Sequence, residues 1–169
     1  MMSNRTHILQ TARTLAVERG SIPSLDDVAQ HAGVPKGGLM HHFRSRAALT
    51  EGVAMQAIEE MDQALAAAAE RGHAVETWLR LSSSREEAAL YRAMAILLTD
   101  PAHLTDDLLR QAAEAAGRWE RLFAEEIGDP VAAAVIHLVG DGMLLNNLSG
   151  DAPSDVDSIV QWLGTKSRT

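Results

Sequence analysis

The sequence contains no cysteine in its 169 residues. Disulfide frameworks, thiolate nucleophiles, zinc ribbons and iron–sulfur clusters are therefore excluded, and a reducing compartment suits the chain. Aromatic residues make up only 4% of the sequence, and there are only five prolines. No run approaches the ~18 consecutive apolar residues of a membrane span, and the N-terminus leads into a polar amphipathic segment rather than a signal sequence. We therefore predict a cytoplasmic protein.

The short motifs of common catalytic sites are also missing. There is no Gly-x-Ser-x-Gly, no P-loop, no Gly-x-Gly-x-x-Gly opening a helix after a strand and no His-Glu-x-x-His. Adjacent His41 and His42 point in different directions on a helix, so they cannot chelate one ion together. We predict that the protein is not an enzyme and has neither a cofactor nor a metal site.

Charge is distributed unevenly along this acidic chain, whose formal net charge is −8. Residues 1–50 contain six cations and three carboxylates, a net charge of +3, so the remainder carries −11. A basic N-terminal segment followed by an acidic remainder is expected where one end of a protein binds a polyanion. The same charge distribution is explained equally well if the acidic remainder of the chain serves only solubility.

Helix propensity is high along nearly the whole sequence, because Ala, Leu, Glu and Arg dominate and little glycine or proline interrupts the periodic segments. No segment has the pattern of a strand. We predict an all-α fold of about nine helices, in which a long fourth helix joins a three-helix N-terminal lobe to a helical C-terminal core. The expected helices lie at about 4–19, 24–33, 35–42, 45–72, 74–81, 85–98, 104–127, 130–148 and 155–164.

Residues 24–43 have the pattern of a helix-turn-helix. Ser24 and Asp27 form a capping box at the start of one short helix, and Gly33 stands where the turn needs a left-handed backbone. The second short helix is expected to bury Leu39 and Phe43. Its outward residues, available to a DNA major groove, are Lys36, Gly37, Met40, His41 and His42.

The position of Lys36 is a further indication of DNA binding. Its charge lies near the positive end of a helix dipole, which a free helix disfavours. A nearby phosphate or guanine edge would compensate for this arrangement.

Two segments follow one another in this region: Ala29-x-x-Ala32-Gly33-Val34, then Lys36-Gly37-Gly38-Leu39-x-x-His42-Phe43-x-Ser45-Arg46-x-x-Leu49. Together they resemble the DNA-binding module of the tetracycline-repressor (TetR) family, over about residues 5–55. Turn, recognition helix and following cap occur together and in order, which makes the resemblance specific. The rest of the chain is similar only in the layout of its helices, which end in two that pair between subunits.

The resemblance implies a ligand-responsive transcriptional repressor, which binds palindromic double-stranded operator DNA as a homodimer and leaves it when a small-molecule effector binds. It implies a helix-turn-helix DNA-binding domain at 1–48 and a helical effector-binding and dimerisation domain at 49–169. Activation instead of repression remains open. A helical adaptor or interaction protein without effector binding is the alternative function.

The same resemblance assigns DNA contacts. Ser24, His42 and Arg46 occupy phosphate-contacting positions, and segment 36–38 would approach the bases. The full set of expected DNA-binding residues is Ser24, Lys36, Gly37, Gly38, Met40, His41, His42 and Arg46.

Two residues on this surface depart from the family pattern. Gly38 stands where many members have Thr, and Met40 stands where they usually have Tyr. We therefore expect one hydroxyl–phosphate contact to be absent and operator affinity to be modest.

Methionine and aromatic side chains of the C-terminal part are candidates for an effector pocket. They either line a cavity or fill the core, and core packing is the commoner role of such residues. A pocket of this composition would take a small, largely apolar effector. The candidate residues are Met61, Trp78, Tyr91, Met94, Trp119, Phe123, His137 and Asp141.

His137 and Asp141 stand four residues apart on a predicted helix and therefore share a face. Three interpretations remain open: a hydrogen-bonded pair at a dimer interface, the lining of an effector pocket, or a metal site or general base.

Segment 130–148 is apolar on nearly all sides, which packing within a small monomer cannot satisfy. We expect another chain to cover it together with the apolar stripe of segment 155–164, since two such helices make half of a four-helix interface. The expected interface residues are Val131, Val135, Leu138, Val139, Ile159, Trp162 and Leu163.

Overall fold

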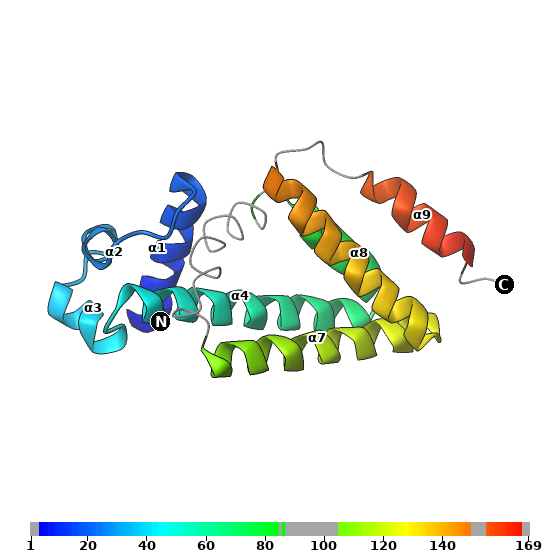
Figure 1. The fold of residues 1–169 in the computed structure, drawn as a ribbon, viewed down its shortest axis with the longest axis horizontal. Helices are drawn as coiled ribbons and strands as arrows, with labels where there is room; N and C mark the ends of the chain where they lie inside the picture. Colours follow the sequence, from blue (N-terminus) through cyan, green and yellow to red (C-terminus); the bar gives the residue numbers. More distant parts are fainter. Residues whose placement is uncertain (1–3, 85, 87–104, 150–154, 167–169) are drawn as a thin grey trace. The chain divides into compact units, whose positions relative to one another are not determined.

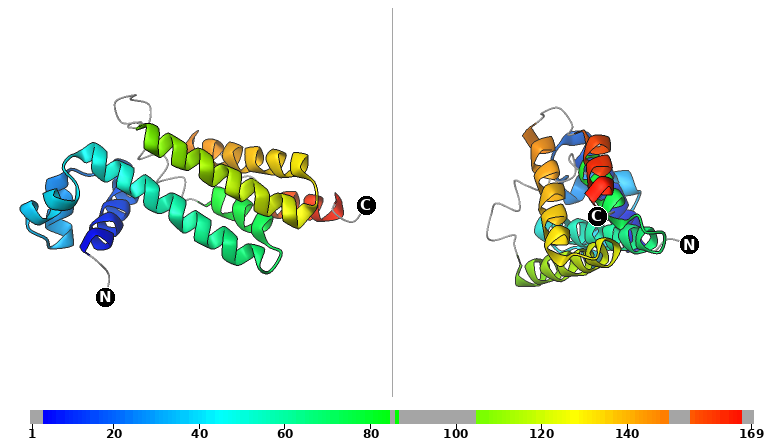
Figure 2. Two further views of the ribbon diagram at one scale, coloured as in Figure 1. Left: turned by 90° about the horizontal axis from the view of Figure 1, so that it is seen from below. Right: turned by 90° about the vertical axis from the view of Figure 1, so that its right-hand side faces the viewer.

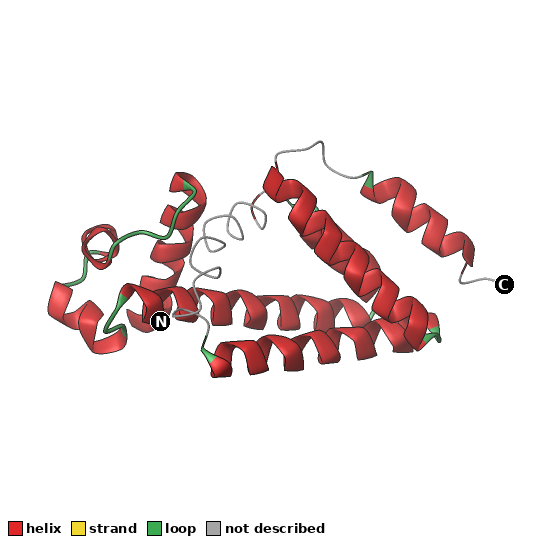
Figure 3. Cartoon of the chain, in the orientation of Figure 1, coloured by secondary structure: helices red, strands yellow, loops and turns green. Residues whose placement is uncertain are grey.

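The computed structural model describes residues 4–84, 86, 105–149 and 155–166. Every regular element in these ranges is a helix, and no strand occurs in them (Figures 1 and 3). The all-α prediction is confirmed, and so is the long fourth helix. The expected helix at 85–98 lies outside the described residues. The helices are α1 (Asn4–Arg19), α2 (Leu25–Ala32), α3 (Lys36–His42), α4 (Arg46–Ala69), α5 (Ala74–Ser82), α7 (Asp106–Ile127), α8 (Pro130–Ser149) and α9 (Val156–Lys166).

The chain divides into two compact units. The N-terminal unit comprises residues 1–58 and 89–111, and the C-terminal unit comprises 59–88 and 112–169. Helices α4 and α7, which Figure 2 shows from two further sides, each contribute residues to both units. None of the helices in the described part of the chain is long and apolar enough to cross a membrane.

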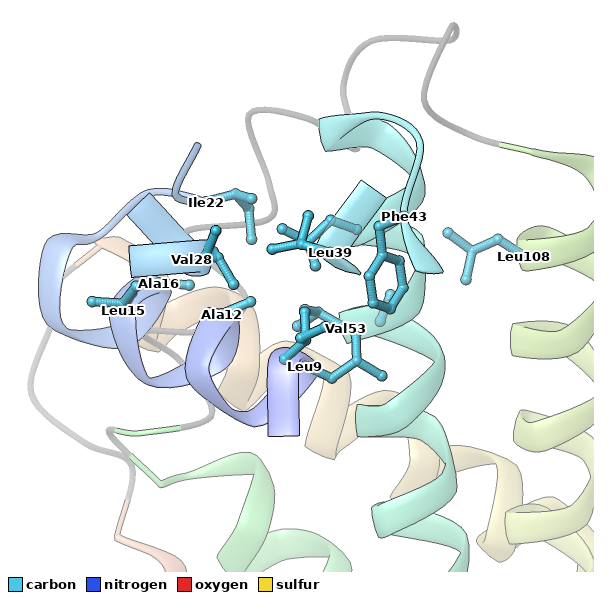
Figure 4. Packing of buried hydrophobic residues seen from close by; sticks show 14 residues of the cluster. Leu9, Ala12, Leu15, Ala16, Ile22, Val28, Leu39, Phe43, Val53 and Leu108 are labelled. Atoms are coloured by element: carbon cyan, nitrogen blue, oxygen red, sulfur yellow. The ribbon is translucent and has the colours of Figure 1, made fainter. Parts of the chain in front are cut away.

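The N-terminal unit is built around one hydrophobic cluster (Figure 4). Helices α1, α2 and α3 pack on one another, and Leu39 and Phe43 are buried between them with Leu49 and Val53 of α4. Leu108 of α7 belongs to the same cluster. The short helices α2 and α3 are thereby held by packing, which stabilises helices too short to persist alone.

Gly52 allows α4 to approach its neighbours closely. A Cβ at this position would lie 2.8 Å from Cε1 of Phe43 and 2.9 Å from Cδ2 of Leu9. Residue 52 therefore has to lack a side chain in this packing. This role of Gly52 was not predicted from the sequence, although a lone glycine inside a helix rich in alanine and leucine is the signal that marks it.

The C-terminal unit has its own core, in which Trp78 of α5 and Phe123 of α7 are among the largest buried side chains. Helix α5 packs against α8 and α9. Its first turn is capped from another helix: Oε2 of Glu126 accepts the N–H of Ala74 at 2.6 Å and that of Val75 at 3.3 Å. This carboxylate satisfies two of the N–H groups that a helix N-terminus leaves unpaired.

Candidate functional site

The turn between α2 and α3 has the predicted geometry. Gly33 follows α2 with φ 64° and ψ 27°, in the left-handed region, and its N–H donates to carbonyls at the end of α2. The N–H of Val34 donates to the Ala29 carbonyl at 3.0 Å. Nε2 of His7 lies 3.1 Å from the Ala32 carbonyl oxygen, which links α1 to the end of α2. These local bonds set the position of α3 relative to α2.

Helix α3 buries one side and exposes the other, as predicted. Leu39 is 0% exposed, and Phe43, directly after the helix, is 3% exposed. A Cβ at Gly37 would meet no atom within 4 Å, and one at Gly38 would meet only Pro35, at 3.9 Å. The backbone at 37–38 is therefore open to close approach by a ligand. The exposed residues of α3 are Lys36, Gly37, Gly38, Met40, His41 and His42.

Ser24 forms the predicted capping box with Asp27. The Asp27 N–H donates to the Ser24 hydroxyl oxygen at 3.1 Å, and that hydroxyl donates to Oδ2 of Asp27 at 2.6 Å. Hydrogen bonds from Ser24 lower the pKa of the Asp27 carboxyl, and the Arg19 guanidinium lowers it further. The Ser24 hydroxyl would have to exchange its bond to Asp27 before donating to a phosphate.

The ammonium of Lys36 pairs with Asp26 of α2, with Nζ and Oδ1 2.7 Å apart. The Asp26 carboxylate therefore offsets, within the protein itself, the cost of placing the positive charge of Lys36 at the N-terminus of α3. The sequence did not reveal this partner, which lies ten residues earlier on another helix, so the position of Lys36 does not by itself indicate DNA. A contact between Lys36 and DNA stays a prediction.

Arg46 begins α4 and donates from Nη2 to the backbone carbonyl of Ile22. Ile22 is buried in the loop before α2. Arg46 therefore joins the start of α4 to this loop, in addition to any DNA contact. This hydrogen bond was not predicted from the sequence.

The two adjacent histidines end α3 on its exposed side. The rings of His41 and His42 meet edge to face with centroids 5.5 Å apart, and the ring of His42 lies 6.4 Å from that of Phe43. No group of three or more His, Asp or Glu side chains in the described ranges is arranged to hold a metal ion.

In the C-terminal unit, four candidate pocket residues form what we call the aromatic cluster: Trp78, Trp119, Phe123 and His137. Ring centroids lie 5.4 Å apart for Trp78 and Trp119, and 5.3 Å apart for Trp78 and His137. The Trp78 indole N–H donates to the Ile136 carbonyl at 3.2 Å. The Trp119 indole N–H donates to Oδ1 of Asp62 at 2.6 Å.

The other candidate pocket residues are distributed differently. Met61 is partly buried against the core that contains the aromatic cluster. Asp141 follows His137 by one turn of α8 and is half-buried. Tyr91 and Met94 lie outside the described residues.

His137 does not pair with Asp141 as expected. Its Nδ1 donates to Oε1 of Glu120 on α7, at 2.8 Å. Burial raises the pKa of the Asp141 carboxyl; nearby His137 opposes this shift and Glu120 adds to it. The shared helix face was inferred correctly, but the partner comes from a different helix, which spacing within one helix cannot reveal.

Comparison with known proteins places these features in a family. Residues 8–53 match the family model described as bacterial regulatory proteins, tetR family. The fold is similar to that of a TetR-family member from Streptomyces coelicolor A3, with 26% identity and a TM-score of 0.72 over 97% of this chain and 98% of that one. Residues 8–53 are therefore those of a TetR-family helix-turn-helix DNA-binding domain. The whole chain has a fold similar to that of TetR-family transcription regulators.

Further solved structures of similar fold extend the comparison. The multidrug binding protein EbrR, in complex with malachite green, matches with 26% identity and a TM-score of 0.66 over 95% of this chain and 96% of that one. EbrR in complex with ethidium matches with a TM-score of 0.69. A TetR-family regulator from Rhodococcus sp., at 18% identity and a TM-score of 0.69, shares the fold over 98% of this chain and 99% of that one. No curated protein matches the sequence significantly.

Helix α8 has an apolar stripe that its own unit leaves exposed. Val131 is 72% exposed, Val135 53% and Leu138 68%. Leu145, which was not among the predicted interface residues, continues the stripe seven residues after Leu138 and is 62% exposed. Val139 of α8 and Trp162 of α9 are also exposed. An apolar surface of this kind is typical of a protein–protein interface.

The remaining predicted interface residues lie on α9. Ile159 is partly buried against the core of its own unit. The side chain of Leu163 is not among those described.

Proposed function

We propose that this protein is a TetR-family repressor that binds a palindromic operator as a homodimer and releases it when a small, largely apolar effector binds. The observation that carries the proposal is the exposed face of α3. This helix is anchored through Leu39 and Phe43 and lies inside the segment that the family model matches. Such a helix enters the DNA major groove in helix-turn-helix proteins. Operator DNA implies a cytoplasmic protein.

The proposed DNA-binding domain is 1–48, and its contacts to DNA are of two kinds. The open backbone at Gly37 and Gly38 lets α3 approach base edges, while Arg46 and His42 meet phosphates. The complete proposed contact surface is Ser24, Lys36, Gly37, Gly38, Met40, His41, His42 and Arg46.

Selection of DNA by the protein tests this proposal. We expect the full-length protein to recover, from a random 30-bp duplex library, sequences with two inverted half-sites about one helical turn apart. Recovery of a single half-site would contradict binding as a dimer. A selected pool indistinguishable from the input library would contradict operator recognition and favour a helical interaction protein.

The proposed dimer interface is the exposed stripe of α8 with Trp162 of α9. Burying an exposed apolar stripe against a second copy is the simplest way to remove it from water, and closed two-fold pairing is the commonest arrangement of such helices. A homodimer also matches the two-fold symmetry of a palindromic operator. The proposed residues are Val131, Val135, Leu138, Val139, Ile159, Trp162 and Leu163.

The proposed effector site is the aromatic cluster with Met61 and Asp141, within the domain 49–169. The other two predicted pocket residues, Tyr91 and Met94, lie outside the described residues. Two observations support it: aromatic side chains are gathered in one core, and the similar EbrR is solved with the aromatic dyes malachite green and ethidium. His137 and Glu120 would supply the few polar contacts that orient an effector.

Dye titration tests the effector site. Nile red, a neutral apolar dye, is expected to quench the tryptophan fluorescence of the protein and to weaken its binding to the selected duplex. Ethidium provides a cationic comparison, with its own affinity for DNA measured separately. Binding of nile red without loss of DNA affinity would contradict the repressor switch, and binding of ethidium alone would contradict the apolar character of the effector.

A further inference from the structure

The Lys and Arg side chains of residues 1–50 differ in what holds them. Four of the six are buried or bonded to groups of the protein itself: Arg13, Arg19, Lys36 and Arg46. The other two, Arg5 and Arg44, are exposed. Neither guanidinium forms a hydrogen bond or an ion pair with a residue that the structure describes. An anion from outside the protein can therefore bind them without displacing such a partner.

Both arginines lie next to Phe43, one in space and one in sequence. Cζ of Arg5, in the first turn of α1, is 5.4 Å from the centroid of the Phe43 ring. Arg44 follows Phe43 in the chain, and the ring of His42 lies 6.4 Å from that of Phe43. Phe43 is 3% exposed and is fixed in the hydrophobic cluster of its unit (Figure 4). We call Arg5, His42 and Arg44 the Phe43 patch.

The contact with Phe43 orients Arg5 without satisfying its hydrogen-bond donors. An aromatic ring attracts a guanidinium through its π-face but offers it no oxygen or nitrogen acceptor, and arginine has five N–H donors. The first turn of α1 contains no acidic residue that could accept from them. An arginine that is already oriented loses less side-chain entropy when it binds a ligand. Arg5 is therefore pre-organised for an external anion.

We propose that Arg5 and Arg44 bind backbone phosphates of the operator, next to the phosphate that His42 meets. The inference rests on the proposed DNA-binding function of α3 and adds two contacts to it. A guanidinium matches a phosphate group in shape and charge and can donate two hydrogen bonds to it. Phosphate contacts fix the orientation of a protein on the duplex without reading its sequence. The Phe43 patch thus holds the C-terminal end of α3 on DNA of any sequence.

These contacts differ from those proposed for Lys36 and Arg46 in what they cost. Lys36 has to leave or share a carboxylate of α2, and Arg46 has to leave or share the Ile22 carbonyl. Arg5 and Arg44 give up no acceptor among the described residues, and Arg5 can keep its contact with Phe43. Each should therefore contribute the full electrostatic effect of neutralising one phosphate.

Arg5→Met and Arg44→Met remove the charge and keep an unbranched apolar side chain. We expect each to lower the log–log salt slope of DNA binding by about 0.9 per subunit. Affinity should fall by up to about fivefold per subunit, equally on the selected and random duplexes. Arg5→Lys should keep the wild-type slope. Arg71→Met is the matched control, because Arg71 is an exposed arginine of the C-terminal unit, and it should bind like the wild type.

Methylphosphonate substitution of the selected duplex locates the contacts, because it makes one phosphate at a time neutral. The wild type should lose affinity at the phosphates that the Phe43 patch binds. Arg5→Met should become insensitive to substitution at one of these positions in each half-site, and Arg44→Met at another. A purely structural role of either arginine would lower affinity and leave the whole pattern of sensitivity unchanged.

Fluorescence anisotropy between about 50 and 300 mM salt measures the slopes, and thermal unfolding verifies that each variant is folded. Lower slopes in both variants, with the matching losses of methylphosphonate sensitivity, support the inference. An unchanged slope in either variant, an equal loss in Arg71→Met, or full retention of the sensitivity pattern would overturn it and leave the proposed function intact. Failure of the wild type to bind either duplex would overturn both.

Discussion

The indole of Trp78 lies directly against Gly140 of α8. A Cβ at residue 140 would be 2.1 Å from Nε1 and 2.4 Å from Cε2 of this indole, whose N–H donates to the Ile136 carbonyl on the same helix. The close approach and the hydrogen bond together fix α5 on α8. Both depend on the absence of a side chain at residue 140.

Gly140→Ala should therefore destabilise the protein, although alanine is the better helix former. The added methyl group has to displace a rigid, fully enclosed ring, and overpacking of this kind costs about 1–3 kcal/mol. Urea unfolding monitored by tryptophan fluorescence measures the change. Gly142→Ala on the same helix is the control: its Cβ would meet nothing within 4 Å, so we expect no loss and a gain of up to about 1 kcal/mol. Equal stability of the two variants would contradict the packing described.

Asp141→Asn should stabilise the protein at neutral pH. Burial raises the pKa of Asp141 in the folded state. The protonated Asp141 carboxyl therefore contributes to the stability of the fold in full only below its ordinary pKa of 3.8, and this contribution is lost as pH rises through the raised pKa. At pH 7 the wild type carries a partly desolvated charge that asparagine avoids. We expect a gain below about 1 kcal/mol, because the side chain is only half-buried and solvent screens it.

Thermal unfolding between pH 3 and pH 8 measures this gain, which should shrink as pH falls towards 3.8. Asp155→Ala provides a comparison of opposite sign. Hydrogen bonds from Ser158 lower the pKa of Asp155, so its stabilisation is present above the ordinary pKa and is lost as pH falls through the lowered one. A loss of stability in Asp141→Asn at pH 7 would contradict the conclusion that burial disfavours the charge on Asp141.

Val135→Glu should convert the proposed dimer to a folded monomer. Val135 is 53% exposed, so its own unit tolerates a charge there, whereas a two-fold interface would bury two unpaired carboxylates. Burying such charges costs several kcal/mol, which weakens the dimer by about 100-fold or more. Sedimentation velocity measures the assembly, and circular dichroism verifies the fold. Ala113→Glu, at an exposed position of α7, should remain dimeric. A monomeric wild type at micromolar concentration would refute the interface.

Lys36→Ala and Arg46→Ala should weaken DNA binding in different ways. Loss of a base-reading lysine should cost about 1–3 kcal/mol on the selected duplex and relax base preference at one position of each half-site. Loss of Arg46 should weaken binding to all sequences alike and reduce the salt slope by about 0.9 per subunit. Fluorescence anisotropy on the selected and random duplexes separates the two patterns. Arg80→Ala, in the C-terminal unit, should bind like the wild type. Identical behaviour of all three variants would contradict both contacts.

Much of the N-terminal unit was predictable because its signals are local. The capping box of Ser24 and Asp27 and the left-handed Gly33 each depend on residues within a few positions of one another. The four-residue spacing of apolar positions correctly predicted that Leu39 and Phe43 are buried and that Met40 is exposed. Short-range backbone and side-chain chemistry suffices for such features.

The partners of the charged side chains were not predictable in the same way. Spacing on one helix suggested Asp141 as the partner of His137, but the imidazole bonds to Glu120. The sequence shows a lysine at the start of α3, but it does not show that Asp26 holds it. Each of these contacts joins residues on two different helices, and the rotation of one helix about the other is not encoded in the spacing along either.

By itself, the sequence determined the helical class, most helix boundaries, the helix-turn-helix and the apolar character of α8. These properties follow from backbone propensity, capping and periodicity, which act over one or two turns of helix. Only the tertiary structure decided that Gly140 receives the Trp78 indole, that Glu126 caps α5 and that Asp26 holds Lys36. The reason is that side-chain contacts between helices depend on packing, and packing is a property of the whole fold.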